Sequence, residues 1–290
     1  MRNIGVLFLA SVLGFFSCDT PNQNEDPVYT VTIVPQQFFL QRLIGNAGTV
    51  NVMVPPGASP ETYDATPRQL QQLQKSNVYF MVGKLGYEQI WKERLQDQFP
   101  ETDFINTSEG MALIQSEHSH GDHMHASVDP HVWMSPRHAK KMVKNMYHVL
   151  LKDATLDTAL VRQNYQNLVS SMDSMHGVFQ TLFSKEDSLS FIIFHPALTY
   201  FAHDYGLEQI EIEFEGKEPS PAYLKRITDY ARRENVKLIF IQEEFDKSNA
   251  TLIAREIGAP LVTINPLAYN WFKTMDEIAT HFKNYIATSK

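Results

Sequence analysis

The sequence predicts an α/β protein made of two (β/α) sandwich lobes with parallel sheets, joined by one long backbone helix. Strand-like and helix-like segments alternate from residue 28 to about residue 100, which is typical of a parallel sheet. A helical pattern then continues with few breaks from residue 135 to about 184. Strand and helix patterns alternate again in the last third of the chain.

The first lobe is assigned to residues 28–150. Its strand candidates are rich in β-branched and aromatic residues. The pair Thr66-Pro67 predicts a helix start, with threonine as the N-cap and proline at the first helical position. The expected strands are residues 28–34, 50–54 and 78–82.

The middle of the chain predicts the linking helix, assigned to residues 151–186. A second cap-and-proline pair, Ser135-Pro136, opens the helical run that leads into it. A coiled-coil dimer would explain the heptad spacing, but the run is short for one, so we expect a monomer whose helix packs along its own lobes. The heptad positions are Val161, Leu168, Met175 and Leu182.

The second lobe is assigned to residues 187–290. Ser220-Pro221 predicts another helix start, and Gly258 predicts the end of the helix before the last strand. The four strand candidates are residues 191–194, 209–213, 237–241 and 261–264.

The N-terminus is typical of a bacterial lipoprotein. Residues 1–17 contain Arg2 and a short apolar run, which fits a secretory signal peptide better than a transmembrane helix. The run ends at Cys18, the single cysteine of the chain, preceded by a small residue as in a lipobox. We therefore expect lipidation at Cys18 and a flexible tether over residues 18–27. The alternatives are an ordinary signal peptide or an uncleaved anchor.

The composition excludes some classes of partner. The chain is 43% hydrophobic, as expected of a protein with a substantial core, and its formal net charge is -8. An acidic protein is a poor match for nucleic acid, so no nucleic-acid partner is expected. Membrane contact is expected through the lipid anchor only.

Four of the eleven histidines lie in one short run within residues 117–125. Imidazole is a ligand that suits zinc, copper and nickel, and a histidine tract can hold such ions loosely. The alternative is an ordinary solvated loop. We predict an auxiliary metal loop formed by His118, His120, His123 and His125.

Four further residues are candidates for an inner metal site. His131 lies between a proline and an apolar pair, just before a capped helix, in a position that would hold it rigidly. His195 and Asn265 each follow a predicted strand, and Glu61 lies in the loop after residues 50–54. Ligands of parallel α/β sheets bind beyond the carboxyl ends of strands, so we expect these four residues to converge.

With these motifs in place, the chain resembles the zinc- and manganese-uptake solute-binding proteins of ABC transporters. The resemblance covers most of the mature chain, and its segments occur in the family's order. They are residues 55–67, the histidine run followed by 129–133, and residues 194–206, 216–220 and 265–268.

The resemblance implies a metal cleft between the lobes, with His131 and His195 as ligands. Where the family's first loop normally reads Ser-Pro-His-Thr, this chain has Glu61. A carboxylate can ligate zinc, but it also improves the case for manganese or iron. Asn265 stands where manganese-binding members often have aspartate, and the fourth ligand could instead be water or a residue of the histidine run.

The resemblance also implies a place in the cell and a partner. The chain would lie outside the cytoplasm, facing the periplasm in a Gram-negative cell. It would deliver Zn²⁺, or Mn²⁺ or Fe²⁺, to the permease of an ABC importer.

Three other functions were considered. Two histidines and a carboxylate also describe a hydrolytic zinc site, but the chain contains neither His-Glu-x-x-His nor Gly-x-Ser-x-Gly. We assign Glu243 and Glu244 to the surface or to an outer layer of the site. A binder of haem or siderophores would need aromatic or arginine-rich walls. An adhesin would need an adhesive motif, and the sequence contains none that we recognise.

Overall fold

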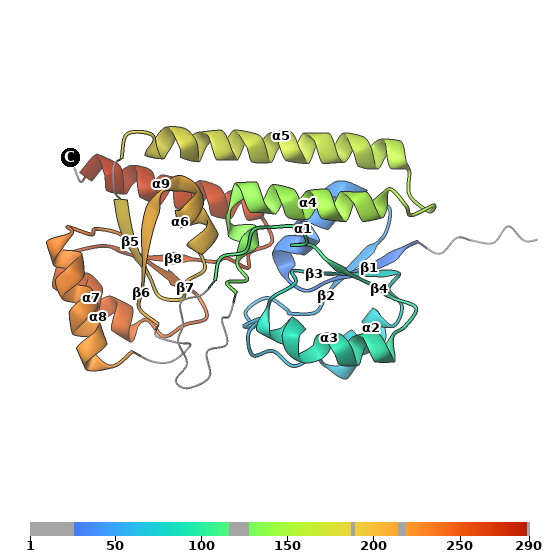
Figure 1. Cartoon of the computed structure of the whole chain (residues 1–290), viewed down its shortest axis with the longest axis horizontal. Helices are drawn as coiled ribbons and strands as arrows, with labels where there is room; N and C mark the ends of the chain where they lie inside the picture. The colour runs from blue at the N-terminus through green and yellow to red at the C-terminus, as the bar shows by residue number, and fades with distance from the viewer. Residues whose placement is uncertain (1–25, 116–127, 187–188, 214–218, 289–290) are drawn as a thin grey trace, which may run out of the picture.

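The computed structural model describes residues 26–115, 128–186, 189–213 and 219–288. Within them, eight strands form two separate four-stranded sheets, each flanked by helices (Figure 1). The predicted α/β class and its two lobes with parallel sheets are confirmed. Cys18 and the histidine run lie outside the described residues.

The first sheet belongs to the N-terminal lobe and has the strand order β2-β1-β3-β4, with every pair parallel. The strand candidates at 50–54 and 78–82 match β2 and β3, whereas the sequence analysis did not identify β4. The elements are β1 (Val28–Val31), α1 (Val34–Ile44), β2 (Thr49–Val52), α2 (Pro67–Leu73), β3 (Val78–Met81), α3 (Gly86–Gln98) and β4 (Asp103–Asn106).

The second sheet has the order β6-β5-β7-β8 and is also parallel throughout. Both sheets therefore share one topology, in which the strand order switches direction between β1 and β3 and between β5 and β7, although the strands themselves stay parallel. Such reversal points are where α/β sheets bind ligands. The elements are β5 (Leu189–Ile193), α6 (Thr199–Tyr205), β6 (Leu207–Glu211), α7 (Pro221–Arg233), β7 (Ile239–Gln242), α8 (Ser248–Ile257), β8 (Leu261–Ile264) and α9 (Trp271–Thr288).

The helical run after residue 135, which was expected to have few breaks, consists of two helices separated by residues 151–157. Helix α4 (Pro136–Leu150) ends in a turn, and α5 (Thr158–Phe183) begins after it. The Asp157 carboxylate accepts hydrogen bonds from the backbone N–H groups of Ala159 and Leu160 and so starts the second helix. Figure 1 shows α5 extending across both lobes, with α4 and α9 beneath it.

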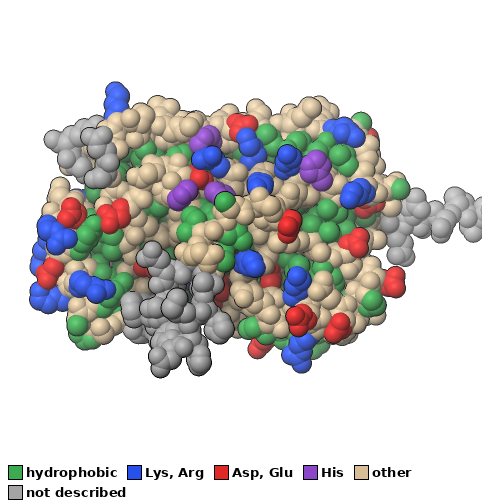
Figure 2. Space-filling view, viewed as in Figure 1, with side chains coloured by type: hydrophobic (Ala, Val, Ile, Leu, Met, Phe, Trp, Pro, Cys, Tyr) green, Lys and Arg blue, Asp and Glu red, His purple; other side chains and the backbone are tan. Residues whose placement is uncertain are grey.

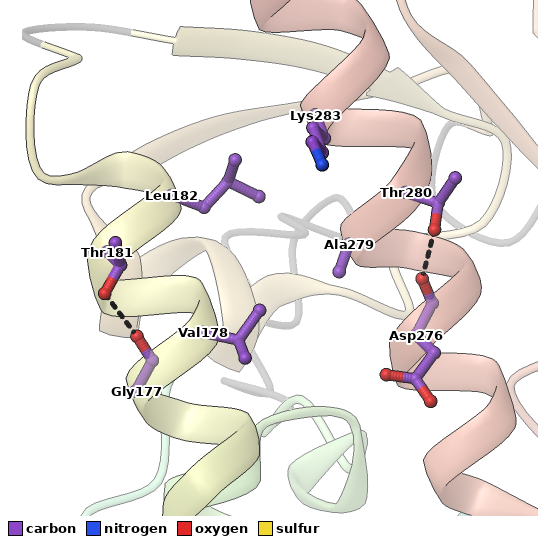
Figure 3. Close-up of a pocket in the computed structure, with 8 residues that line it drawn as sticks. All are labelled: Gly177, Val178, Thr181, Leu182, Asp276, Ala279, Thr280 and Lys283. Carbon is purple, nitrogen blue, oxygen red and sulfur yellow. Dashed lines mark hydrogen bonds between the residues drawn. The ribbon is translucent and has the colours of Figure 1, made fainter.

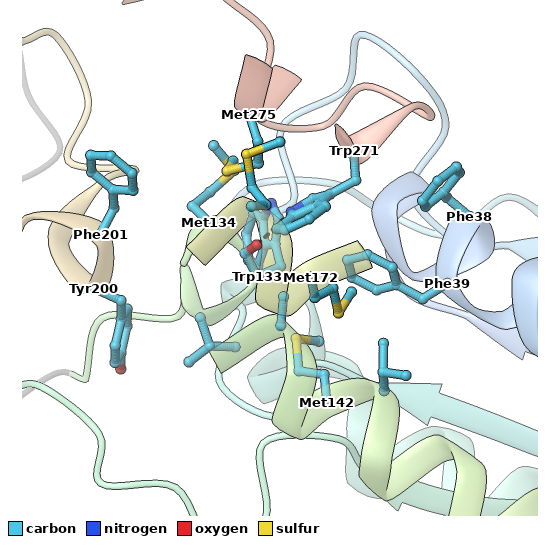
Figure 4. Close-up of a cluster of buried hydrophobic side chains, with 14 of the residues drawn as sticks. Phe38, Phe39, Trp133, Met134, Met142, Met172, Tyr200, Phe201, Trp271 and Met275 are labelled. Carbon is cyan, nitrogen blue, oxygen red and sulfur yellow. Dashed lines mark hydrogen bonds between the residues drawn. The ribbon is translucent and has the colours of Figure 1, made fainter. Parts of the chain in front are cut away.

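One continuous apolar core connects the lobes through these helices. The Trp133 indole donates to the carbonyl of Pro266, and the Trp271 indole donates to the carbonyl of Trp133. Because both indoles are buried, these bonds fix one lobe against the other. Figure 4 shows the surrounding side chains, which include Phe38, Phe39, Met142, Met172, Tyr200, Phe201 and Met275.

Charged side chains are dispersed over the described surface in the view of Figure 2, with Lys and Arg standing among Asp and Glu. That pattern is unlike the basic surface of a nucleic-acid-binding protein. Among the described helices, none has both the length and the apolar character needed to cross a membrane.

A buried carboxylate organises the loop between β3 and α3. Glu88 accepts hydrogen bonds from the backbone N–H groups of Val82 and Gly83 and from the Thr32 hydroxyl. Burial raises the pKa of the Glu88 carboxyl to about 7, although these hydrogen bonds oppose the rise. The loop is thereby held so that the N–H of Gly86, the first residue of α3, donates to Glu61 Oε2 at 3.0 Å.

Two glycines in this chain should respond in opposite ways to alanine. A Cβ on Gly86 would lie 2.6 Å from Glu61 Oε2 and 2.7 Å from Glu61 O, whereas a Cβ on Gly177, inside α5, has nothing within 4 Å. Gly86→Ala should lower the free energy of unfolding by about 1–3 kcal/mol. Gly177→Ala should raise it by about 0.5–1 kcal/mol, because alanine favours helix.

Urea denaturation followed by circular dichroism checks this pair. Equal changes of the same sign in both variants would contradict the close approach of Glu61 to Gly86.

Candidate metal centre

A small cavity of about 20 Å³ lies between the lobes, beyond the carboxyl ends of several strands. A water molecule needs roughly 10–15 Å³ measured in this way, so the cavity has room for about one small species. Haem and other drug-sized ligands occupy pockets of roughly 300–1,000 Å³. The lining residues are Ser59, Pro60, Glu61, His131, Trp133, His195, Ala197, Gln242, Glu244, Phe245, Pro266 and Leu267.

His131 reaches this cavity from the turn before α4 and is buried. Asp129, which is also buried, accepts hydrogen bonds from the His131 backbone N–H at 2.8 Å and from Nδ1 at 3.0 Å. Tyr200 of α6 donates to the Asp129 carbonyl at 2.8 Å, which anchors the segment to the other lobe. The ring is therefore held with Nδ1 toward the carboxylate and Nε2 toward the cavity.

His131 and Asp129 each shift the pKa of the other. Burial is the largest single influence and lowers the pKa of His131, but the Asp129 carboxylate, together with Glu61 and Glu213, raises it above the usual value of 6.5. Burial likewise opposes ionisation of Asp129, yet His131 lowers the pKa of that carboxyl below 3.8. A histidine oriented in this way by a carboxylate is the usual arrangement in zinc sites.

His195 enters the cavity from the opposite lobe, just after β5. Its Nδ1 lies 2.6 Å from Glu213 Oε2, so this ring also has a carboxylate on its outer nitrogen. The Gln242 side chain bonds the backbone of His195 on both sides, accepting from its N–H and donating to its carbonyl. Phe245 stacks on the imidazole with ring centroids 5.4 Å apart.

The two inner nitrogens face one another, with His131 Nε2 and His195 Nε2 3.2 Å apart. When each Nδ1 donates to a carboxylate, both Nε2 atoms of the neutral rings carry lone pairs, and neither can donate to the other. A cation between them removes this repulsion. Two nitrogens bound at about 2.0–2.1 Å to a tetrahedral zinc ion lie roughly 3.3–3.4 Å apart, which nearly matches the observed separation.

Glu61 lies at the same cavity, as the sequence analysis predicted. Its Oε2 accepts from Gly86, while Oε1 is buried without a hydrogen-bond partner in the described part of the chain. A buried carboxylate oxygen without a partner is costly unless something binds it. Within the described ranges, however, no three His, Cys, Asp or Glu side chains already surround one point closely enough to hold an ion.

The structure does not bring Asn265 into the cavity lining. Its Oδ1 accepts from the Leu267 N–H at 2.9 Å, and its Nδ2 donates to Glu243 Oε2 at 3.2 Å. Pro266 and Leu267 line the cavity instead. The four histidines of the run fall in 116–127, outside the described residues, although the bridge between Gln115 and Val128 joins the residues that flank this segment.

Glu244 lines the cavity, although the sequence analysis assigned it to the surface or an outer layer. It lies two residues beyond β7, and burial raises the pKa of its carboxyl while His195 and His131 act in the opposite direction. The adjacent Glu243 points to Asn265. A sequence with two consecutive glutamates after a strand signals that a carboxylate is near the strand end, but it does not indicate which one faces inward.

A larger hollow of about 720 Å³ lies elsewhere, between α5 and α9. Figure 3 shows Val178, Leu182 and Ala279 in its wall, with Asp276 and Lys283 on the α9 side. The Thr181 and Thr280 hydroxyls bond to carbonyls of their own helices, at Gly177 and Asp276. Since its described lining contains no histidine or cysteine, it offers no counterpart to the paired imidazoles of the small cavity.

The chain matches known proteins over nearly its whole length. The family described as "Zinc-uptake complex component A periplasmic" matches residues 30–285. The "High-affinity zinc uptake system protein ZnuA" of Bacillus subtilis (strain 168) is 29% identical over 255 residues, which cover 83% of this chain and 79% of the relative. The "Zinc-binding lipoprotein AdcA" of Streptococcus pneumoniae (strain ATCC BAA-255 / R6) is 26% identical over 281 residues. That match covers 92% of this chain and 56% of AdcA.

Solved structures agree with the fold. The "Crystal structure of ZnuA" superposes with a TM-score of 0.82 at 30% identity, covering 90% of this chain and 99% of that one. A zinc-bound deletion mutant of ZnuA gives the same TM-score and identity. The resemblance identified from the sequence motifs is thus confirmed. From its fold, the paired imidazoles and the family match, the chain belongs to the zinc-uptake component A family of periplasmic solute-binding proteins.

Proposed function

We propose that this protein captures a divalent transition metal, zinc in the first place, outside the cytoplasm and delivers it to an ABC importer. The observation that carries the proposal is the pair of His131 and His195 Nε2 atoms, 3.2 Å apart in a cavity sized for one ion. Each ring has a carboxylate at its Nδ1, an orientation that leaves Nε2 available to metal. Glu61 Oε1 supplies an anionic oxygen at the same place.

Zinc is the preferred cargo on chemical grounds as well as by relationship. Two imidazole nitrogens with carboxylate oxygen make a borderline donor set that suits zinc. The Bacillus subtilis relative is named for high-affinity zinc uptake, and the Streptococcus pneumoniae relative for zinc binding. Because Glu61 replaces a nitrogen ligand by a harder oxygen, manganese and iron remain second candidates.

The competing functions fit less well. A cavity of about 20 Å³ excludes a haem or a siderophore. The family is one of substrate-binding transport components rather than enzymes, which confirms the prediction that the chain is not an enzyme. The interlobe hydrogen bonds of Trp133 and Trp271 favour small movements of the lobes during capture and release.

Three features outside the cavity complete the proposal. Lipidation of Cys18, followed by the tether 18–27, would keep the protein at the membrane near its permease. The histidine run 118–125 would collect ions close to the cavity, because its flanks, Gln115 and Val128, are joined near Asp129. The protein would act as a monomer, since one chain provides both histidines.

Replacing either inner histidine should abolish tight binding. We expect His131→Ala and His195→Ala each to weaken zinc binding by at least about 100-fold, since changes even in residues behind the ligands cost 10- to 100-fold. The matched control is His203→Ala, whose side chain is 71% exposed on α6 and should leave affinity unchanged. Competition titration against a chromophoric chelator measures all three. Small losses in both inner variants, or an equal loss in the control, would refute the site.

Affinity should depend on pH in a defined direction. The raised pKa of His131 means that protons begin to compete with metal above pH 6.5, so zinc affinity should fall as pH decreases through that value. Asp129→Asn keeps an acceptor for the ring but removes the charge, so the fall should begin at lower pH. Zinc dissociation constants measured between pH 5 and 8 test this, and a constant affinity down to pH 5 would argue against histidine ligation.

A further inference from the structure

The cavity contains few groups able to bind a cation. Among its described lining residues, the polar side chains are Ser59, Glu61, Gln242, Glu244 and the two histidines, apart from the Trp133 indole, which only donates. The Ser59 hydroxyl accepts from the Glu61 backbone N–H at 3.3 Å. The Gln242 amide is engaged at both ends by the backbone of His195. Elimination therefore leaves two carboxylates, Glu61 and Glu244, beside the two imidazoles.

Asn265 is a weaker candidate than Glu244 for four reasons. It is absent from the cavity lining, and its carbonyl oxygen, the atom that would bind a cation, caps the N–H of Leu267. Its amide nitrogen is held by Glu243, the residue next to Glu244. A neutral amide also leaves a divalent ion with less compensating charge than a carboxylate does.

The position of Glu244 is the one expected for a ligand in this topology. Glu244 follows β7, and His195 follows the adjacent parallel strand β5. The strand order of the sheet switches direction between these two strands. Glu244 lines the same small cavity as the His131 and His195 imidazoles. The carboxyl group is partly desolvated at the cavity and accepts from its own backbone N–H, while the residue as a whole is exposed. The side chain therefore has room to rotate.

Charge also favours a second carboxylate. Asp129 and Glu213 already accept from the outer nitrogens of the two imidazoles, so neither is free to ligate an ion between the rings. Two neutral imidazoles with Glu61 and Glu244 would bring two negative charges to the ion, which neutralises a divalent cation. Four protein donors would also fill the tetrahedral shell that zinc prefers.

We propose that Glu244 is the fourth metal ligand and turns inward when the ion binds, in place of Asn265. This inference rests on the proposed function. The ion would then be held by one nitrogen and one carboxylate from each lobe: Glu61 and His131 from the N-terminal lobe, and His195 and Glu244 from the C-terminal lobe. Each lobe alone would offer only half of the site, so capture would join the two halves.

The test compares two adjacent glutamates: Glu244 lines the cavity, whereas Glu243 accepts a hydrogen bond from Asn265. Glu244→Gln should weaken zinc binding by at least about tenfold, and Glu243→Gln, the matched control, should not. Asn265→Ala should likewise leave affinity within about twofold of the wild type. Cobalt(II) substitution supplies a readout independent of affinity. The visible absorption of the cobalt-loaded wild type should be the intense band of a tetrahedral ion, and only Glu244→Gln should change its shape and intensity.

The outcomes separate this inference from the proposed function. Wild-type protein that binds neither zinc nor cobalt would overturn the proposed function itself. Tight binding that is lost in His131→Ala yet unchanged in Glu244→Gln, with an unchanged cobalt spectrum, would overturn only the role of Glu244. A variant lacking residues 117–125 is the last comparison. If this deletion weakens zinc binding and Glu244→Gln does not, the fourth ligand lies in the histidine run. A melting temperature measured without metal confirms that each variant is folded.

Discussion

The site depends on one distance, that between His131 Nε2 and His195 Nε2, and the rest of the structure maintains it. The two atoms belong to different lobes, so their 3.2 Å distance depends on how the lobes pack. When both rings are neutral and each Nδ1 donates to a carboxylate, the two Nε2 atoms are both acceptors, and a proton or a metal ion between them is favourable. The packing of the lobes thus holds two nitrogen atoms where one cation can bind between them.

Several layers of contacts hold this geometry. Directly behind the imidazoles, Asp129 and Glu213 set the orientation of each ring. Behind them, Tyr200 and Gln242 fix the backbone segments that carry the rings. The buried tryptophans then connect the lobes, and helix α5 spans both of them (Figure 1). Ligand orientation in metal sites depends strongly on such supporting residues. Contacts throughout the fold therefore help to orient the side chains around a cavity of about 20 Å³.

The sequence predicted the fold well because strand patterns and cap-and-proline pairs are local signals. The break between α4 and α5 has only a weak sequence signal, since residues 151–157 contain neither proline nor glycine and only Asp157 caps the new helix. Glu61, His131 and His195, which the sequence places in loops and after a strand, line one cavity in the structure. Asn265 also follows a strand, but its side chain turns back to Leu267, and that choice depends on tertiary contacts. The choice between Glu243 and Glu244 depends on tertiary contacts in the same way.

The central claim is that one ion lies between the two imidazoles, and diffraction locates an ion directly. Crystals of the protein loaded with one equivalent of zinc, measured at the zinc absorption edge, would give an anomalous difference map. The account predicts a single strong peak about 2.0–2.1 Å from both His131 Nε2 and His195 Nε2. A strong zinc peak elsewhere, with the two rings still facing one another and nothing between them, would contradict it.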